Sequence, residues 1–197
     1  MKITIFTSNH PRHISLISKL EKVSEKCFAI IETTSLFQGK SGDFYKKSKI
    51  MDEYFNKVRN SENKYFGSPN FISNKSKILP VNMGGLNDLD TNILGEALSS
   101  DIFLVFGSSF IKGWLIEFLI KKKAMNIHLG VSPYYRGNSC NFWACYEDNF
   151  HLNGATIHML SSGLDSGDIL FHALPNLDGC NNLFDFTMKS VYVAQKA

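Results

Sequence analysis

The chain has 197 residues, of which 44% are hydrophobic and 20% charged, and its formal net charge is +3 at pH 7. These values are typical of one globular domain with a sizeable core, and the small charge does not indicate a dedicated nucleic-acid binder. No apolar stretch has the length of a membrane span or of a secretory signal, so a cytoplasmic protein is expected.

The predicted elements alternate between strands and helices. In chain order they are a strand at 2–8, a helix at 11–26, a strand at 27–34, a helical segment within 39–68, a short strand at 77–81, a helix at 88–99, a strand at 101–107, a helix at 112–122, a strand at 124–130, a helix at 139–148, strands at 154–160 and 167–174, and a helix at 182–197. This alternation predicts an α/β fold with a Rossmann-like, mostly parallel sheet and helices on both faces. We also expect an antiparallel strand late in the chain.

We expect a single domain over residues 1–197, with a helical excursion at about 39–75 that falls outside the strand–helix alternation of the core. Its apolar residues recur at helical intervals: Phe44, Met51, Tyr54, Phe55 and Val58. Its basic residues alternate with acidic ones, which favours a solvated helix over a nucleic-acid surface. The last helix has no glycine or proline stop signal, so a missing C-terminal portion is expected.

Several cofactor and metal classes are disfavoured by their missing patterns. The first strand is followed by "TSNHPRH" in place of a G-x-G-x-x-G turn, and there is no P-loop. The four cysteines form no C-x-x-C pair, which predicts free, mostly buried thiols, and no histidine spacing favours a metal. His158 and His172 are expected to be packed or hydrogen-bonded strand residues and Trp143 a core residue, whereas the loop position of His10 suggests substrate contact.

The polar residues with the clearest chemical meaning are Asn126 and His128, at the end of a predicted strand, and Asp165 in the later loop "SGLDSGD". An amide can donate a hydrogen bond to an oxyanion, and an imidazole can exchange a proton near neutral pH. A carboxylate can fix the imidazole's tautomer or raise its pKa. With no recognisable covalent nucleophile, this set suits direct acyl transfer to an amine. Taken singly, each residue also fits a structural role at a strand end or in a turn.

The segment "NIHLGVSPYYRG", a helix, a Gly-Ala-Thr strand and "GLDSGDIL" follow one another in this order. This arrangement resembles the catalytic core of the folate-dependent formyltransferases, which include methionyl-tRNA formyltransferase, glycinamide ribonucleotide transformylase and sugar N-formyltransferases. The resemblance covers residues 101–197 and the first strand–helix–strand unit. It implies the formyltransferase fold, with Asn126, His128 and Asp165 on the family's catalytic positions and protonated His128 helping to hold the oxyanion.

The resemblance also implies 10-formyltetrahydrofolate as the formyl donor, with no metal. Its pterin would lie beside two loops, formed by Gly107, Ser108, Ser109, Phe110 and Ile111 and by Ser161, Ser162, Gly163 and Leu164. Many relatives have Ser-x-Leu-Pro after the histidine where this chain has Gly130 and Ser132, so contacts to the acceptor are expected to differ. The residues expected to bind the acceptor are His10, Tyr134, Tyr135 and Arg136.

The favoured acceptor is the primary amine of a small molecule, such as a nucleotide-linked amino sugar. Glycinamide ribonucleotide and methionyl-tRNA stay as alternatives, and nucleic acid is disfavoured because no long basic surface is evident. Hydrolysis of formyltetrahydrofolate and a non-catalytic folate- or nucleotide-binding module are further alternatives, although retention of all three catalytic residue types speaks against the module. A homodimer is left open.

Overall fold

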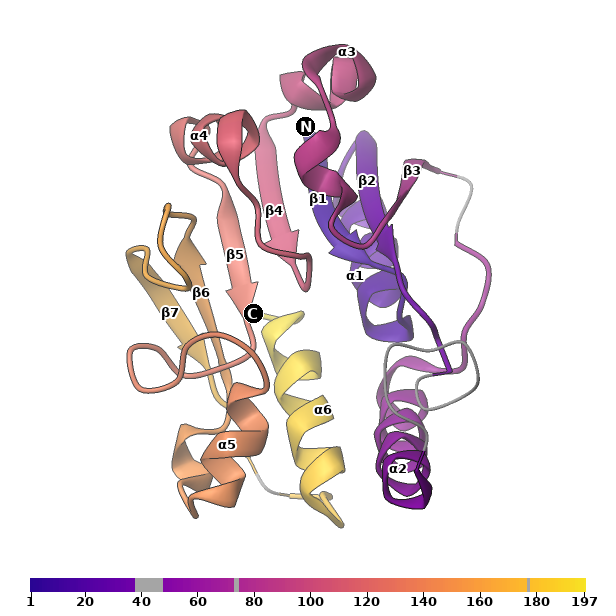
Figure 1. The fold of residues 1–197 in the computed structure, drawn as a ribbon, viewed down its shortest axis with the longest axis vertical. Helices are drawn as coiled ribbons and strands as arrows, with labels where there is room; N and C mark the ends of the chain where they lie inside the picture. The colour runs from indigo at the N-terminus through magenta and orange to yellow at the C-terminus, as the bar shows by residue number, and fades with distance from the viewer. Residues whose placement is uncertain (38–47, 73–74, 177) are drawn as a thin grey trace.

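The computed structural model describes residues 1–37, 48–72, 75–176 and 178–197, and its centre is a seven-stranded sheet (Figure 1). The strands are β1 (Lys2–Ser8), β2 (Lys26–Thr33), β3 (Ser76–Asn82), β4 (Ile102–Phe106), β5 (Met125–His128), β6 (Ala155–Met159) and β7 (Ile169–Ala173). Their order across the sheet is β3-β2-β1-β4-β5-β6-β7. All seven match strands predicted from the sequence, with ends that differ by a few residues.

The sheet is mostly parallel. Strands β1 to β5 pair in parallel, while β6 is antiparallel to both β5 and β7. The predicted fold class, including the late antiparallel strand, is therefore confirmed. In open parallel sheets ligands bind beyond the carboxyl ends of the strands, and β4 and β5 point toward the end of the molecule where α2, α5 and α6 extend (Figure 1).

Six α-helices and three short 3-10 helices connect the strands within the described residues. The α-helices are α1 (Pro11–Val23), α2 (Lys49–Phe66), α3 (Thr91–Leu94), α4 (Gly113–Lys121), α5 (Cys140–Tyr146) and α6 (Leu183–Ala194). The 3-10 helices are η1 (Gly85–Asp88), η2 (Gly95–Ser99) and η3 (Phe150–Leu152). None of the helices described here is long and apolar enough to cross a membrane.

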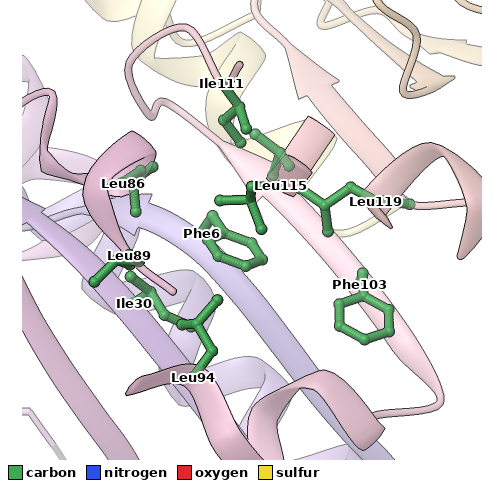
Figure 2. Packing of buried hydrophobic residues seen from close by; sticks show 11 residues of the cluster. Phe6, Ile30, Leu86, Leu89, Leu94, Phe103, Ile111, Leu115 and Leu119 are labelled. Atoms are coloured by element: carbon green, nitrogen blue, oxygen red, sulfur yellow. The ribbon is translucent and has the colours of Figure 1, made fainter. Parts of the chain in front are cut away.

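Consecutive strand residues point to opposite faces of the sheet and so feed two separate cores. Phe6 of β1 packs with Leu115 of α4 and with η1 and α3 on one face (Figure 2). Its neighbour Ile5 packs with Ile17 of α1 and Met188 of α6 on the other. Burial of such side chains contributes about 1.5–3 kcal/mol each. Helices thus cover both faces, as predicted.

Helix α2 forms the described part of the predicted excursion, and it packs on the domain. Ser48 accepts a hydrogen bond from the backbone N–H of Met51 and so caps the helix. Phe55 is buried, and Val58 packs against the core on the α1 and α6 face. This segment interrupts the strand–helix alternation, yet α2 packs against the core. Phe44 and its neighbours fall in 38–47, outside the described residues.

Two further local predictions are wrong. The helix expected over 88–99 is broken into η1, α3 and η2, because Asp90 accepts from the backbone N–H groups of Asn92 and Ile93 and starts a new helix. Trp143 is 48% exposed, since the short α5 buries its other face, which carries Cys140, Ala144 and Cys145. The cysteines are free thiols, as predicted: Cys27, Cys140 and Cys145 are buried and Cys180 is partly buried.

Candidate active site

Asn126, His128 and Asp165 meet at the carboxyl end of β5. Both Asn126 and His128 lie on β5, while Asp165 approaches from the loop between β6 and β7. Asn126 Nδ2 donates a hydrogen bond of 3.1 Å to Asp165 Oδ1, and His128 Nδ1 lies 3.2 Å from Asp165 Oδ2. The three residues predicted to act together are thus in direct contact, although they are separated by up to 39 positions in the sequence.

The carboxylate of Asp165 is held from two sides. Its side chain is 11% exposed, and the backbone N–H of Gly137 donates to its Oδ2 at 2.9 Å. Asp165 and Gly137 both have positive φ, at 44° and 89°. Aspartate tolerates this left-handed region better than most side chains, and glycine adopts it freely. The Arg-Gly of the motif therefore contributes a backbone donor that orients Asp165.

Opposing effects set the charge state of His128, which is 5% exposed. Burial lowers its pKa, while the Asp165 carboxylate and the Tyr135 carbonyl raise it, and the net direction is downward. Yet His128 Nε2 lies 2.9 Å from the carbonyl oxygen of Tyr135. Both ring nitrogens thus face acceptors, which only the doubly protonated ring could satisfy at once. The pocket therefore matches an imidazolium in geometry, but burial opposes the resting protonated state that the sequence comparison implied.

Ionisation of Asp165 is favoured overall. Burial raises the pKa of its carboxyl, but the neighbouring imidazoles of His158 and His128 and the Gly137 N–H lower it more, so the net direction is downward. Asp165 is therefore a carboxylate at neutral pH, available to stabilise positive charge on His128.

His158 is part of this cluster, which the sequence did not reveal. It lies on β6 opposite Asn126 and is 1% exposed, so it is the buried strand residue that was expected. Its Nδ1 lies 2.8 Å from the Met159 carbonyl and must carry the proton, and its Nε2 then accepts from Asn126 Nδ2 at 3.1 Å. Cross-strand pairing of β5 with β6, which the sequence alone does not fix, brings it here. His172 on β7 is exposed, but its Nε2 lies 2.9 Å from the Ser132 carbonyl oxygen, so it is a hydrogen-bonded strand residue, as expected.

Gly130 is required by a close approach to His128. A Cβ at this position would lie 2.6 Å from His128 Nε2 and 2.6 Å from Cys140 Cβ. Gly130 therefore leaves room for Cys140, whose Sγ lies 3.7 Å from His128 Nε2. Burial raises the pKa of the Cys140 thiol to about 11, so this thiol is uncharged at neutral pH and a poor nucleophile.

A cavity of about 770 Å³ opens in front of the cluster. It is lined by Asn126, His128 and Asp165 and by both loops expected to hold the pterin, of which Ser162 is missing from the lining. The same cavity is also lined by Ser8, His10 and Thr34 and by Tyr54 of α2 and Phe184 of α6, whose ring centroids lie 5.4 Å apart. The structure thus brings together the three residues predicted to be catalytic, nearly all of the two loops predicted to hold the co-substrate, and His10.

The segment Tyr134, Tyr135 and Arg136 lies elsewhere. These residues line a separate, more open hollow of about 460 Å³ together with Trp143 and Glu147. The Tyr135 hydroxyl donates to Glu147 at 2.6 Å and accepts from Asn149 at 2.9 Å. The side chains of Tyr134, Tyr135 and Arg136, which were expected to bind the acceptor, therefore do not line the main cavity. Only the Tyr135 carbonyl reaches His128. Within the same described residues, no group of three potential metal ligands is found.

Comparison with known proteins places this geometry in context. No family model matches the sequence. A curated relative, methionyl-tRNA formyltransferase of Prochlorococcus marinus, is 30% identical over 92 residues, which is 47% of this chain and 28% of that enzyme. The chain thus spans less than a third of the length of the curated relative it matches.

Solved structures agree over nearly the whole chain. Phosphoribosylglycinamide formyltransferase from Anaplasma phagocytophilum superposes with a TM-score of 0.59 at 16% identity, covering 99% of this chain and 81% of that one. A 4-N formyltransferase from Francisella tularensis gives 0.57 at 21%, covering 99% and 64%. A formyltetrahydrofolate deformylase from Pseudomonas syringae gives 0.61 at 12%, covering 100% and 58%. The chain has the formyltransferase fold.

Proposed function

We propose that this protein transfers a formyl group from 10-formyltetrahydrofolate to a primary amine. The observation that carries the proposal is the contact of Asn126, His128 and Asp165 at the wall of a large cavity, in a chain with the formyltransferase fold. Amide, imidazole and carboxylate are the groups that acyl transfer to an amine requires when no covalent nucleophile takes part.

In the proposed reaction the acceptor nitrogen attacks the formyl carbon. A carbon–nitrogen bond forms, and the carbonyl electrons move to the formyl oxygen, which Asn126 Nδ2 and His128 stabilise. The bond from the formyl carbon to N10 of the folate then breaks, while the proton lost by the amine is transferred to N10. Asp165 compensates the positive charge of His128 whenever both ring nitrogens carry a proton, because its Oδ2 lies 3.2 Å from His128 Nδ1.

Binding of the formyl oxygen requires an exchange of hydrogen-bond partners. Asn126 Nδ2 donates to Asp165 and to His158, and His128 Nε2 faces the Tyr135 carbonyl. The formyl oxygen would replace His158 as one acceptor and the Tyr135 carbonyl as the other. Donors held in a buried, preorganised site stabilise a developing oxyanion by about 2.7–4 kcal/mol each.

The co-substrate would occupy the part of the cavity between the loops at 107–111 and 161–164. The whole cavity has a volume of about 770 Å³, within the range of about 300–1,000 Å³ that is usual for small-molecule sites. Backbone groups of two loops suit a pterin ring, whose edge carries both donors and acceptors. We assign no metal to the reaction, since the proposed chemistry needs only the amide, the imidazole and the carboxylate.

The acceptor would occupy the rest of the cavity. The part of its lining formed by Ser8, His10 and Thr34 is polar and uncharged at pH 7, because burial lowers the pKa of His10 to about 4. The Arg12 guanidinium beside it is paired with Glu62 at 2.7 Å. Such groups suit sugar hydroxyls, and the aromatic wall of Tyr54 and Phe184 suits a planar base. These features support a nucleotide-linked amino sugar more than a tRNA.

The test is the consumption of 10-formyltetrahydrofolate, followed by absorbance, with a panel of amino sugars, glycinamide ribonucleotide and charged tRNA. Loss of the folate only when an amine is added supports transfer and identifies the acceptor class. Loss without an amine would instead indicate hydrolysis, and binding without turnover a non-catalytic module. We infer that the reaction takes place in the cytoplasm, where thiols such as the four free cysteines stay reduced.

A further inference from the structure

Glu32 is a buried carboxylate that the proposed chemistry does not use. It lies near the carboxyl end of β2 and is 2% exposed. No cationic side chain of the described residues pairs with it. It accepts instead from the backbone N–H of Gly84 at 2.7 Å and from the N–H and hydroxyl of Ser109 at 2.5 and 2.6 Å. A buried charge is costly unless such donors stay in place, so Glu32 fixes both segments that supply them.

Both segments shape the cavity wall. Ser109 lies in the loop at 107–111, all of whose residues line the cavity, and Met83 beside Gly84 lines it as well. Asn87 of η1 fastens the far half of the same loop, because it donates to the Phe110 carbonyl at 3.0 Å and accepts from the Lys112 N–H at 2.7 Å. Among the described residues Glu32 itself does not line the cavity. Any effect on a ligand must therefore pass through the loop.

We propose that Glu32 is a positioning residue that holds the 107–111 loop in the shape that binds the folate co-substrate. The inference rests on the proposed function and extends it to a residue on the opposite side of the loop from the ligand. A carboxylate is needed because Oε1 and Oε2 both accept hydrogen bonds. An amide would set an N–H against one of these donors and release that part of the loop.

The experiment compares Glu32→Gln and Ser109→Ala with wild type, using the acceptor that the amine panel identifies. Glu96→Gln is the matched control. Glu96 is also an acidic residue with three donors, but these are Lys2, Lys26 and Lys77, which belong to β1, β2 and β3 near their amino ends, away from the cavity. The measurements are kcat, the KM for each substrate, and hydrogen exchange of the free protein.

For Glu32→Gln we expect at least a tenfold rise in the KM for 10-formyltetrahydrofolate, with the acceptor KM and kcat changed less than threefold. Amide exchange should accelerate at Gly84 and at residues 109–112 but not in β6. Ser109→Ala, which removes one of the donors, should raise the folate KM about threefold and decides the matter if Glu32→Gln does not fold. Glu96→Gln should change neither KM.

An unchanged folate KM in a folded variant would overturn the inference, as would equal changes in kcat and both KM values, which indicate a general structural role. These results differ from failure of the proposed function. Wild-type protein that neither binds nor consumes the folate would contradict the proposed function itself. If wild type consumes the folate and Glu32→Gln and Ser109→Ala consume it equally well, only the role given to Glu32 is contradicted.

Discussion

Asp165→Asn isolates the role of the carboxylate, because the substitution keeps the shape of the side chain and removes its charge. Asp165 accepts from Asn126 Nδ2 and from the Gly137 N–H, so one of these donors would meet an amide N–H in the variant. A lost hydrogen bond to a charged group costs about 1.5–3 kcal/mol. We therefore expect the free energy of unfolding at pH 7 to fall by about 2 kcal/mol.

The same change should slow catalysis far more than it destabilises the protein. Without the carboxylate 3.2 Å from Nδ1, the pKa of His128 falls further, since burial is no longer opposed by Asp165. Acid–base catalysis contributes typically about 10²–10⁴ in rate, so kcat should fall by about 10³. The residual activity should rise toward lower pH, where His128 regains its proton.

The pH dependence of stability gives an independent check. Because the folded pKa of Asp165 is lowered, its contribution is fully present above the unfolded value of about 3.9 and is lost as the pH falls through the folded value. The difference between wild type and Asp165→Asn should therefore shrink in acid. Urea unfolding at several pH values and initial rates provide the assays.

Asp168→Asn is the control for this prediction. Asp168 lies three positions further along the same loop and is exposed, and its side chain makes no hydrogen bond with any described residue. Its substitution should leave both the free energy of unfolding and kcat unchanged. If Asp165→Asn stayed folded and kept kcat within threefold of wild type, with an unshifted pH profile, the assignment of Asp165 would be refuted.

Three further predictions concern room around His128, the core and buried histidines. Gly130→Ala should destabilise the fold by about 1–3 kcal/mol and lower kcat at least tenfold, because the new Cβ would lie 2.6 Å from His128 Nε2. Thermal unfolding and initial rates test this prediction, and an unchanged rate would contradict it. Leu94→Ala, which truncates a side chain only 4% exposed, should lower the free energy of unfolding in urea by about 2–5 kcal/mol and leave kcat unchanged. A decrease below about 1 kcal/mol would contradict this, because it would show that the surrounding core closes over the space left by the side chain. Burial lowers the pKa of His10 from 6.5 to about 4, so its contribution to stability is present above pH 6.5 and is lost as the pH falls toward 4, by about 3 kcal/mol in all. His10→Gln should flatten this dependence, and equal slopes for variant and wild type would argue against it.

Much of the fold could be predicted from the sequence because the buried strands are short apolar runs bounded by polar segments. Residues 2–8 and 101–107 match β1 and β4 to within one residue at each end. The helix expected over 88–99 failed because the capping of α3 by Asp90 is a local hydrogen-bonding choice that periodicity does not reveal. The prediction that Trp143 lies in the core was wrong because a short helix has two faces, and its sequence does not show which one is buried.

The contact of Asn126, His128 and Asp165 follows from the strand-end positions together with the family resemblance. His158 and the Gly137 N–H could not be found in the same way. The first depends on the register of the antiparallel β5–β6 pair, and the second on a backbone group that carries no side-chain signal. The placement of Tyr134 and Arg136 outside the main cavity depends on the path of the loop before α5, which composition does not determine.

The central claim is that His128 acts on a formyl group in transit to an amine, and transfer of an isotopically labelled formyl group tests it most directly. With 10-formyltetrahydrofolate labelled in the formyl carbon, wild type should place the label on the amine nitrogen. His128→Ala should do so about 10²–10⁴ times more slowly while binding tetrahydrofolate within threefold of wild type. Label released as formate in the presence of the amine, or a His128→Ala rate within threefold of wild type, would contradict the account.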